Sequence, residues 1–237
     1  MRIAVIMPLA GRTHDCAASL QALAEMRRHG HRVIAVDSGD SRGNGRGDSG
    51  TPAALADRLV YAPEGWSRQV NAGSRAPEVD LADALVFLPA GVRLPPHADR
   101  SIARALANST SPWGRFDIRY RRPPGLSQWP YTLAAAIANA AARLTGICSR
   151  EQVIFVSRGA FLALEGYTPV DPRADGAADS AVDADFSRRA RQLGPPIVLH
   201  EPALAPPPAR RPGALWRAVW RREWARLEMA LGMAELH

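Results

Sequence analysis

Short apolar runs alternate with segments of helical periodicity along the first half of the chain. The runs at residues 2–7, 31–37, 59–62 and 84–88 have the length and composition of buried strands, and Pro8 is expected to end the first of them. Apolar residues recur at helical spacing over residues 15–29, with Asp15 as the expected N-terminal cap and Gly30 as the stop. A second helix is expected over residues 67–76. Strands that alternate with helices in this way predict βαβ units and a mainly parallel sheet.

The second half has a less regular pattern. We expect strands at residues 113–120, 152–156 and 197–199, an alanine-rich helix at 131–148 and a short basic helix at 186–193. Residues 169–185 are acidic and are expected to form a loop. The predicted fold is therefore α/β, with helices flanking a Rossmann-type sheet. We expect one domain over residues 1–201, divided into halves at 1–110 and 111–201, followed by a further segment at 202–237.

This last segment combines a Pro-rich link, residues 202–212, with an amphipathic helix over residues 213–236. The helix places Trp216, Trp220 and Trp224 four residues apart, so they share one face. Its arginines fall on the other faces, at Arg217, Arg221, Arg222 and Arg226. Such a helix can lie on an acidic membrane surface, or it can pack on this domain or on a second copy of the chain. The sequence leaves these alternatives open.

Composition adds a basic character. The chain has 237 residues, a net charge of +7 and 30 basic residues, all of which are arginine. A pI near 10.5 favours anionic partners such as nucleotide phosphates, acidic lipid or nucleic acid, although a solvated basic surface and genomic base composition explain it equally well. Nucleic-acid binding is disfavoured because no aromatic platform accompanies the arginines.

Cysteine spacing and hydropathy bear on the cellular setting. Cys16 and Cys148 stand far apart and in no CxxC pattern, so neither a zinc site nor a disulfide is indicated. The apolar N-terminal run is too short for a signal peptide, and the alanine-rich segment carries Asn139 and Arg143, which argues against a membrane span. We therefore expect a cytoplasmic protein, with peripheral attachment to the inner membrane face as a further possibility.

Candidate chemistry follows the predicted strand ends, where open α/β sheets bind ligands. Asp37 and Gly39 follow the second strand, and a carboxylate there can accept hydrogen bonds from a base or ribose. Arg68 and Asn71 lie at a helix start, where they can hold a phosphate or a base. Asp183 can accept a proton from a hydroxyl group, or it can simply cap the helix that follows.

Several reaction classes lack their motifs. The chain has no Walker motif, no GxGxxG spacing, no paired His/Glu metal motif and no nucleophile elbow. The turn after the fourth strand, Pro89-Ala90-Gly91, carries no carboxylate, histidine or cysteine. The strand end best placed for a site therefore lacks reactive side chains.

A series of motifs spans nearly the whole chain. In order they are Ile3-Ala-Val-Ile-Met-Pro8, Val36-Asp-Ser-Gly39, Arg68-Gln-Val-Asn-Ala-Gly73, Phe87-Leu88 with Arg93-Leu-Pro95, Trp113-Gly-Arg-Phe-Asp117, Leu144-Thr-Gly-Ile147, Gln152-Val-Ile-Phe-Val156, Gly166-Tyr167 and the segment from Asp183 to Arg189. Together they resemble family 2 glycosyltransferases of the GT-A fold. More narrowly, they resemble the bacterial arsenosugar-biosynthesis glycosyltransferase branch.

The resemblance implies an enzyme that transfers a sugar from a nucleotide-diphosphate donor to an unknown acceptor, with inversion. It implies that the first half binds the donor and the second half shapes the acceptor site. The donor-binding residues it implies are Pro8, Asp37, Gly39, Arg68, Asn71, Gly73 and Arg93. Asp183 matches the acidic residue that deprotonates the acceptor hydroxyl.

The chain departs from the family at the turn. Pro89-Ala90-Gly91 stands where this branch has His-Ala-Asp, and Val182 replaces the glutamate of the usual Glu-Asp pair. A divalent metal, Mn or Mg, is usual in the family, but its ligands are absent here and we predict no metal ligand. Arginine could offset part of the diphosphate charge, and Arg93, Arg68 and Arg42 are the nearest in sequence. The alternative is a non-catalytic relative that binds a nucleotide or a protein partner.

Overall fold

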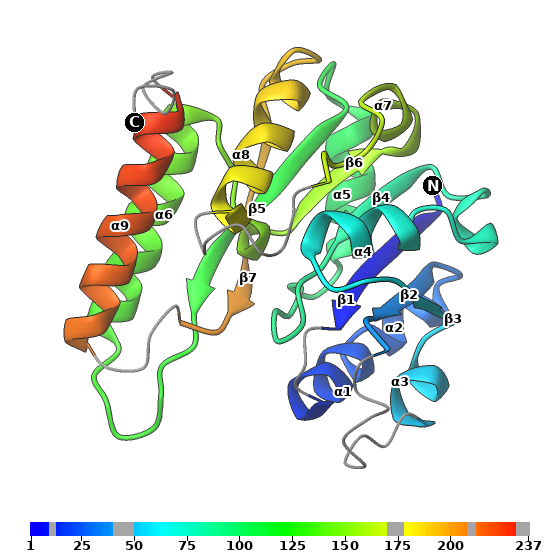
Figure 1. Cartoon of the computed structure of the whole chain (residues 1–237), viewed down its shortest axis with the longest axis horizontal. Helices are drawn as coiled ribbons and strands as arrows, with labels where there is room; N and C mark the ends of the chain where they lie inside the picture. Colours follow the sequence, from blue (N-terminus) through cyan, green and yellow to red (C-terminus); the bar gives the residue numbers. More distant parts are fainter. Residues whose placement is uncertain (10–12, 40–49, 170–177, 208–211, 231–237) are drawn as a thin grey trace.

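A computed structural model describes residues 1–9, 13–39, 50–169, 178–207 and 212–230. Its centre is a seven-stranded sheet of order β3-β2-β1-β4-β6-β5-β7 (Figure 1). The strands are β1 (Ile3–Leu9), β2 (Arg32–Asp37), β3 (Arg58–Tyr61), β4 (Ala84–Phe87), β5 (Trp113–Tyr120), β6 (Ile154–Ser157) and β7 (Ile197–Ala205). All neighbours are parallel except that β6 is antiparallel to both β4 and β5. The prediction of a mainly parallel α/β sheet is confirmed.

Helices cover both faces of the sheet. They are α1 (Thr13–Gln21), α2 (Ala24–Arg28), α3 (Gly50–Leu55), α4 (Trp66–Gly73), α5 (Ala98–Ala107), α6 (Trp129–Thr145), α7 (Arg158–Ala163), α8 (Ala178–Arg191) and α9 (Pro212–Ala230), with short 3₁₀ turns η2 (Pro77–Val79) and η3 (Arg150–Gln152). Alternate residues of β1 point into two separate apolar clusters. Ile3 and Val5 belong to the cluster that also contains residues of α1, α5, α6 and α9, whereas Ala4 and Ile6 belong to the cluster that contains residues of α4, α7 and α8. No described helix is long and apolar enough to cross a bilayer.

Two predictions in the first half were wrong in detail. Pro8 does not end the first strand, since β1 continues through it to Leu9. Pairing with β4 stops at Ile6, so only β2 flanks Pro8 and a proline is tolerated there. The predicted helix at 15–29 is two helices separated at Ala22–Leu23, and the first begins before Asp15, which therefore is not its cap.

Two predictions in the second half were also wrong. The acidic segment at 169–185 was expected to be a loop, but α8 begins at Ala178 and contains Asp183 within it, so Asp183 does not cap a following helix. The last strand is longer than residues 197–199, since β7 runs to Ala205 and includes Pro202. The predicted Pro-rich link therefore starts inside a strand. Both misreadings arose because proline and aspartate are common in turns, a preference that tertiary packing overrides here.

The C-terminal helix packs on this domain. Leu215 and Val219 of α9 are buried in the same apolar cluster as the inner face of α6. Figure 1 shows α9 side by side with α6 at one end of the sheet. Of the alternatives that the sequence left open, packing on the domain is thus realised by one face of the helix. The division into a domain at 1–201 and a segment at 202–237 stays a prediction.

Candidate functional site

The register of the strands brings several candidate residues to one edge of the sheet. Asp37 at the end of β2 pairs with Leu9 of β1 and with Tyr61 of β3. The Leu88 N–H just after β4 donates to the Ile6 carbonyl, so β4 ends at the same edge. Because β6 is antiparallel to β4, β6 begins at this edge, and the preceding turn η3 lies there as well. This carboxyl edge is where open α/β sheets bind ligands.

Asp37 and Gly39 form a tight turn at the end of β2. The Asp37 Oδ1 atom accepts a hydrogen bond from the Gly39 N–H at 3.4 Å. Gly39 has a φ of +78°, a conformation that glycine adopts readily. Asp37 is half-buried. Arg42 and the rest of residues 40–49 lie outside the described residues.

The turn after β4 is held by three neighbouring elements. The Gly91 N–H donates to Ser19 Oγ of α1 at 3.0 Å, and the Gly91 carbonyl accepts from Arg121 Nη2 at 3.1 Å. Arg121 directly follows β5. Arg93, two residues beyond the turn, forms backbone hydrogen bonds with Leu204 of β7, and its side chain is exposed. The Arg121 guanidinium therefore contacts the turn directly, and the exposed side chain of Arg93 follows it in the chain.

The turn does not fit a divalent cation. Its side chains offer no oxygen or nitrogen ligand, and the Gly91 carbonyl already accepts from a cationic guanidinium. Among the described residues, no group of three or more His, Cys, Asp or Glu side chains could hold a metal. We derive no metal-dependent step for this site.

Helix α4 contributes Arg68 and Gly73 in different ways. Arg68 lies in the first turn of the helix, is half-buried and makes no hydrogen bond or ion pair that we identify among the described residues. Gly73 is buried against the sheet, and a Cβ there would lie 2.6 Å from Ile6 and 2.8 Å from Val36. Its contacts are thus with the strands, and it lets the helix approach β1 and β2 closely.

Asn71 joins the two halves of the molecule. Its Nδ2 donates to the Tyr167 carbonyl at 2.7 Å, and its Oδ1 accepts from the Tyr167 N–H at 2.9 Å. Gly166 makes this approach possible, since a Cβ there would lie 2.6 Å from Asn71 Oδ1. Both ends of the amide are thereby bonded to the segment after α7. A role for Asn71 in holding the donor stays a prediction.

Asp183 is a buried carboxylate with one free oxygen. Its Oδ2 accepts from the Arg150 N–H at 2.9 Å and from Arg150 Nε at 3.3 Å. Its Oδ1 is buried and has no hydrogen-bond partner among the described residues. Burial raises the pKa of Asp183 to about 6, although the Arg150 guanidinium acts in the opposite direction. Since Arg150 belongs to η3, it places Asp183 at the carboxyl edge.

Aromatic residues surround this carboxylate. The Arg150 guanidinium lies 4.9 Å from the Trp66 ring centroid, and Trp66 meets Tyr167 edge-on. Tyr167 stacks on Phe186 at 4.2 Å. Burial raises the pKa of Tyr167 well above its usual value, and the nearby Asp183 adds to the rise. The Trp66 indole nitrogen and the Tyr167 hydroxyl are both buried and face each other, and the interaction with Trp66 partly opposes the rise in the pKa of Tyr167.

The unpartnered oxygen of Asp183 has a chemical meaning. A buried polar atom without a partner costs about 1–3 kcal/mol, so Asp183 Oδ1 points to a ligand that completes its hydrogen bonding. A carboxylate whose pKa lies near neutrality can accept a proton at physiological pH. Asp183 Oδ1 therefore has the chemistry of a proton acceptor.

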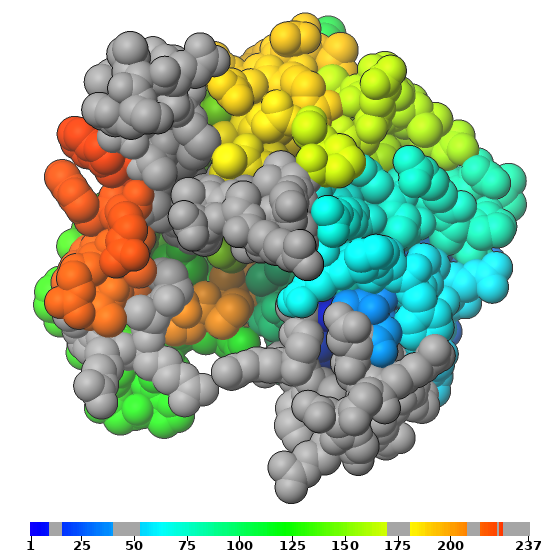
Figure 2. Space-filling model, in the orientation of Figure 1, coloured from blue at the N-terminus to red at the C-terminus, as the bar shows by residue number. Residues whose placement is uncertain are grey.

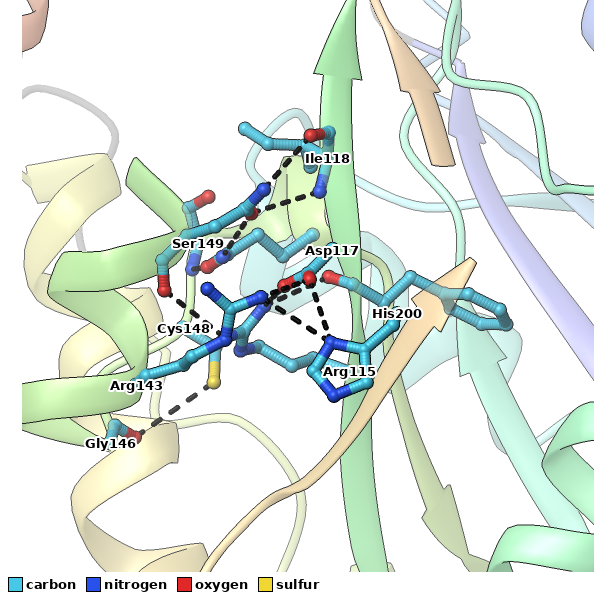
Figure 3. A network of polar contacts seen from close by, with 11 residues as sticks. Arg115, Asp117, Ile118, Arg143, Gly146, Cys148, Ser149 and His200 are labelled. Carbon is cyan, nitrogen blue, oxygen red and sulfur yellow. Dashed lines mark hydrogen bonds and ion pairs between the residues drawn. The ribbon is translucent and has the colours of Figure 1, made fainter. Parts of the chain in front are cut away.

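A second polar network stiffens the same half of the molecule (Figure 3). Arg115, which is fully buried on β5, donates to Asp117 Oδ1 at 2.9 Å. Arg143 of α6 and His200 of β7 converge on Oδ2 of the same carboxylate. Asn139 bonds both backbone groups of Ile118. The network joins β5, α6 and β7, and its role is to stabilise the packing of these elements.

Sequence reasoning missed Trp66, Arg121 and Arg150. Trp66 and Arg150 matter through contacts that form only when α4, η3 and α8 meet. A partial signal existed for η3, because Ser149 and Gln152 have the spacing of a capping box and do form one. No local sequence pattern distinguishes Arg121 from the other arginines of the chain.

A surface hollow of about 620 Å³ lies elsewhere, at the amino ends of the strands, and is lined by residues that include Arg2, Arg32 and Leu81. We do not assign it as the site, because ligands of such sheets bind at the opposite edge.

Comparison with known proteins gives structural matches alone. No protein-family model and no curated protein sequence matches the chain. A mannosyltransferase from Pyrobaculum calidifontis, solved with GDP-Man and Mn²⁺, matches 99% of this chain and 64% of its own, at 19% identity and a TM-score of 0.60. Residues 1–349 of S. aureus TarS with UDP-GlcNAc match 97% of this chain and 70% of that one, at 10% identity and a TM-score of 0.60.

A third match is glucosyl-3-phosphoglycerate synthase from Mycobacterium tuberculosis, solved with Mn²⁺, UDP and its product. It covers 97% of this chain and 80% of that one, at 16% identity and a TM-score of 0.59. The chain thus spans 64% of the length of the mannosyltransferase that it matches. Membership of family 2 and of the arsenosugar branch stays a prediction. The mainly parallel sheet with helices on both faces is the GT-A fold that these glycosyltransferases share.

Proposed function

We propose that the chain is a glycosyltransferase that moves a sugar from a nucleotide-diphosphate donor to an acceptor hydroxyl, with inversion at the anomeric carbon. The observation that carries the proposal is Asp183, a buried carboxylate at the carboxyl edge with one unpartnered oxygen and a raised pKa. The GT-A fold supports it, since the similar structures contain GDP-Man, UDP-GlcNAc or UDP.

In the proposed reaction Asp183 is the base. Its Oδ1 accepts the proton of the acceptor hydroxyl while the hydroxyl oxygen attacks the anomeric carbon of the donor sugar. The bond between that carbon and the phosphate oxygen breaks, and the nucleoside diphosphate leaves with the bonding electrons. A single displacement of this kind inverts the anomeric configuration. Arg150 holds the carboxylate through Oδ2 and leaves Oδ1 free for the proton.

The leaving diphosphate needs compensation for its charge. We propose that guanidinium groups at the carboxyl edge supply it, with Arg121 and Arg93 at the turn after β4 and Arg68 on α4. Guanidinium binds phosphate with two parallel hydrogen bonds. The loss of the metal ligands at this turn remains part of the proposal, and Asp37 is proposed to contact the base or ribose. A cytoplasmic location also stays a prediction.

Calorimetric titration with UDP and with GDP, in the presence of a chelator and then of Mn²⁺, tests the donor site. We expect micromolar to millimolar binding that Mn²⁺ does not tighten, and we expect Arg121→Gln to weaken it by about tenfold. Arg75→Gln changes an exposed arginine that follows the C-terminal end of α4; it serves as the matched control and should leave binding unchanged. Tightening by Mn²⁺ would contradict the proposed loss of the metal.

A non-catalytic relative is the second candidate, and the turn without acidic side chains favours it. Such a protein binds the nucleotide but does not consume the donor. Release of free sugar from UDP- or GDP-sugars, with water as acceptor, distinguishes the two, because only an enzyme cleaves the donor. Absence of nucleotide binding would contradict the glycosyltransferase proposal and leave protein binding as the remaining function.

A further inference from the structure

Helix α6 presents an apolar face that nothing in the described part of the chain covers. Trp129 and Leu144 at its two ends are 63% and 86% exposed, and Leu133 and Ile137 between them are exposed as well. The spacing of these residues places all of them on one face of the helix. Single exposed apolar residues are ordinary on protein surfaces, but a continuous stripe along a whole helix marks an interaction site.

Helix α9 extends this face. Trp220 and Trp224 are 71% and 51% exposed and stack on each other at 5.8 Å. Trp216 lies one turn before them and contacts Trp129, with ring centroids 6.4 Å apart. Trp129 and Trp216 both lie near the start of their helices, so the two helices run in the same direction. The exposed apolar residues of α6 and those of α9 therefore start at the same end of the helix pair. Figure 2 shows side chains of α9 in orange-red and of α6 in green along the same flank. We call this flank the α6/α9 surface.

The charges beside the α6/α9 surface are positive. Arg217 and Arg221 are exposed on α9, next around the helix from the tryptophans, and Arg122 is exposed just before α6. Residues 121–145 contain no Asp or Glu at all. Glu223 is the one acidic residue among the described side chains of α9, and it is buried. Among its described side chains the surface thus combines exposed indoles, aliphatic groups and guanidinium groups, and none of them is an exposed carboxylate.

We propose that the α6/α9 surface binds an anionic lipid bilayer, with both helices lying in the plane of the interface. Tryptophan favours the headgroup region because its ring is apolar and its N–H is polar. Guanidinium groups pair with lipid phosphates, and each contributes to attraction by an anionic leaflet. A second copy of the chain fits less well, since the arginines of the two copies would meet across the contact. This inference is independent of the proposed function.

Vesicle flotation of the full chain tests the proposal. The probes are phosphatidylcholine vesicles and vesicles that also contain phosphatidylglycerol, each at low and high salt. We expect binding to the anionic vesicles that weakens in high salt. Trp220→Ser with Trp224→Ser should reduce the binding by about tenfold or more, because the indoles no longer enter the interface. Arg217→Gln and Arg221→Gln should each reduce it by roughly fivefold.

Two matched controls distinguish binding through the α6/α9 surface from non-specific adsorption to vesicles. Leu81→Ser removes an apolar residue that is equally exposed but lies at the amino edge of the sheet, and Arg75→Gln removes an arginine outside the surface. Both should bind anionic vesicles like the wild type. Absence of binding to anionic vesicles would overturn the proposal, as would equal binding to neutral vesicles or equal losses in the controls.

The second-copy alternative has its own readout. Sedimentation velocity without lipid should show a monomer for the wild type and for Trp220→Ser with Trp224→Ser. A dimer that these substitutions dissociate, without vesicle binding, would assign the surface to a contact between copies and overturn the lipid proposal. Unchanged melting temperatures in the variants would show that the exposed residues do not affect folding.

Discussion

The two halves of this molecule keep their polar groups in different places. Strands β3, β2, β1 and β4 are parallel and packed between apolar clusters, and Asp37 lies at their carboxyl edge. The half built on β6, β5 and β7 mixes strand directions and buries charged groups. These include Arg115, Asp117 and Asp183. The first half thus brings the ends of parallel strands together at one edge, and the second holds charged groups in fixed positions.

The difference suggests a division of labour. An edge with arginines nearby suits a charged, extended molecule such as a nucleotide diphosphate. A buried carboxylate suits proton transfer, because burial raises its pKa toward neutrality. Asn71 and Tyr167 connect the two regions through a pair of hydrogen bonds. We therefore expect substitutions in the second half to affect chemistry, and substitutions at the connection to affect how the halves are held together.

The largest effect is expected from Asp183→Asn. Removal of the base should lower the rate of sugar release from the donor by about 10²- to 10⁴-fold, with nucleotide affinity unchanged. Steady-state rates and a calorimetric titration of the same sample measure both quantities. Asp185→Asn, on the next half-turn of α8 and paired with Arg189, is the control and should keep most of the rate. If Asp183→Asn kept the wild-type rate, the assignment of Asp183 as the base would be wrong.

Asp117→Ala should cause the largest loss of stability. It leaves the fully buried Arg115 without its carboxylate, which costs about 3–5 kcal/mol. Asp80→Ala removes an exposed pair with Arg158 and should cost less than about 1 kcal/mol. Urea denaturation of the two variants gives the comparison. Similar losses in both would contradict the structural role of the network in Figure 3.

The raised pKa of Asp183 also predicts how stability depends on pH. The folded chain keeps the proton up to about pH 6, whereas the ordinary value in an unfolded chain is 3.8. Between these values the folded state binds more protons, so this group lowers the free energy of unfolding as pH rises, by about 3 kcal/mol in total. Urea midpoints across this window should fall more steeply for the wild type than for Asp183→Asn. Parallel curves would show that the pKa is not raised.

Asn71→Ala should weaken the connection between the halves. It leaves the Tyr167 N–H and carbonyl without their partners, which costs about 1–3 kcal/mol. Ser74→Ala, which removes a bond local to the same helix, should cost less. Hydrogen exchange at the Tyr167 amide gives the local readout, and we expect faster exchange in Asn71→Ala alone. Unchanged exchange would mean that the segment is held by other contacts.

A loss of stability in the same range as for Asn71→Ala is expected at Gly73, where it falls lower if the neighbouring side chains move. Its replacement by alanine places a methyl group against Ile6 and Val36 and should cost about 1–3 kcal/mol, reduced where those side chains can shift. Gly159→Ala is the control, because its Cβ would meet no atom within 4 Å. Equal melting temperatures for the two variants would contradict the tight packing of α4 on the sheet.

Apolar periodicity predicted the fold well where burial alone determines structure. Residues 31–37 and 84–88 are buried on both faces, so their composition identified the strands β2 and β4. Prediction failed where tertiary contacts override local preference. Pro202 lies inside β7, and Asp183 lies inside α8 although its neighbours are typical of loops.

The candidate site was only partly readable from the sequence. Asp37 and Asp183 carry a chemical signal in their residue type, and both are found at the carboxyl edge. The partners that set their properties are distant in sequence. Arg150 meets Asp183 across thirty-three positions and Trp66 approaches Arg150 from α4, so neither pairing leaves a local pattern.

The pH dependence of sugar release from a nucleotide-diphosphate sugar tests the central claim most directly, because it reports on the base in the working protein. If Asp183 accepts the proton, the rate should rise tenfold for each pH unit below about pH 6 and level off above it, and Asp183→Asn should abolish this rise. A rate that does not change through this range, or a rise that persists in Asp183→Asn, would contradict the account.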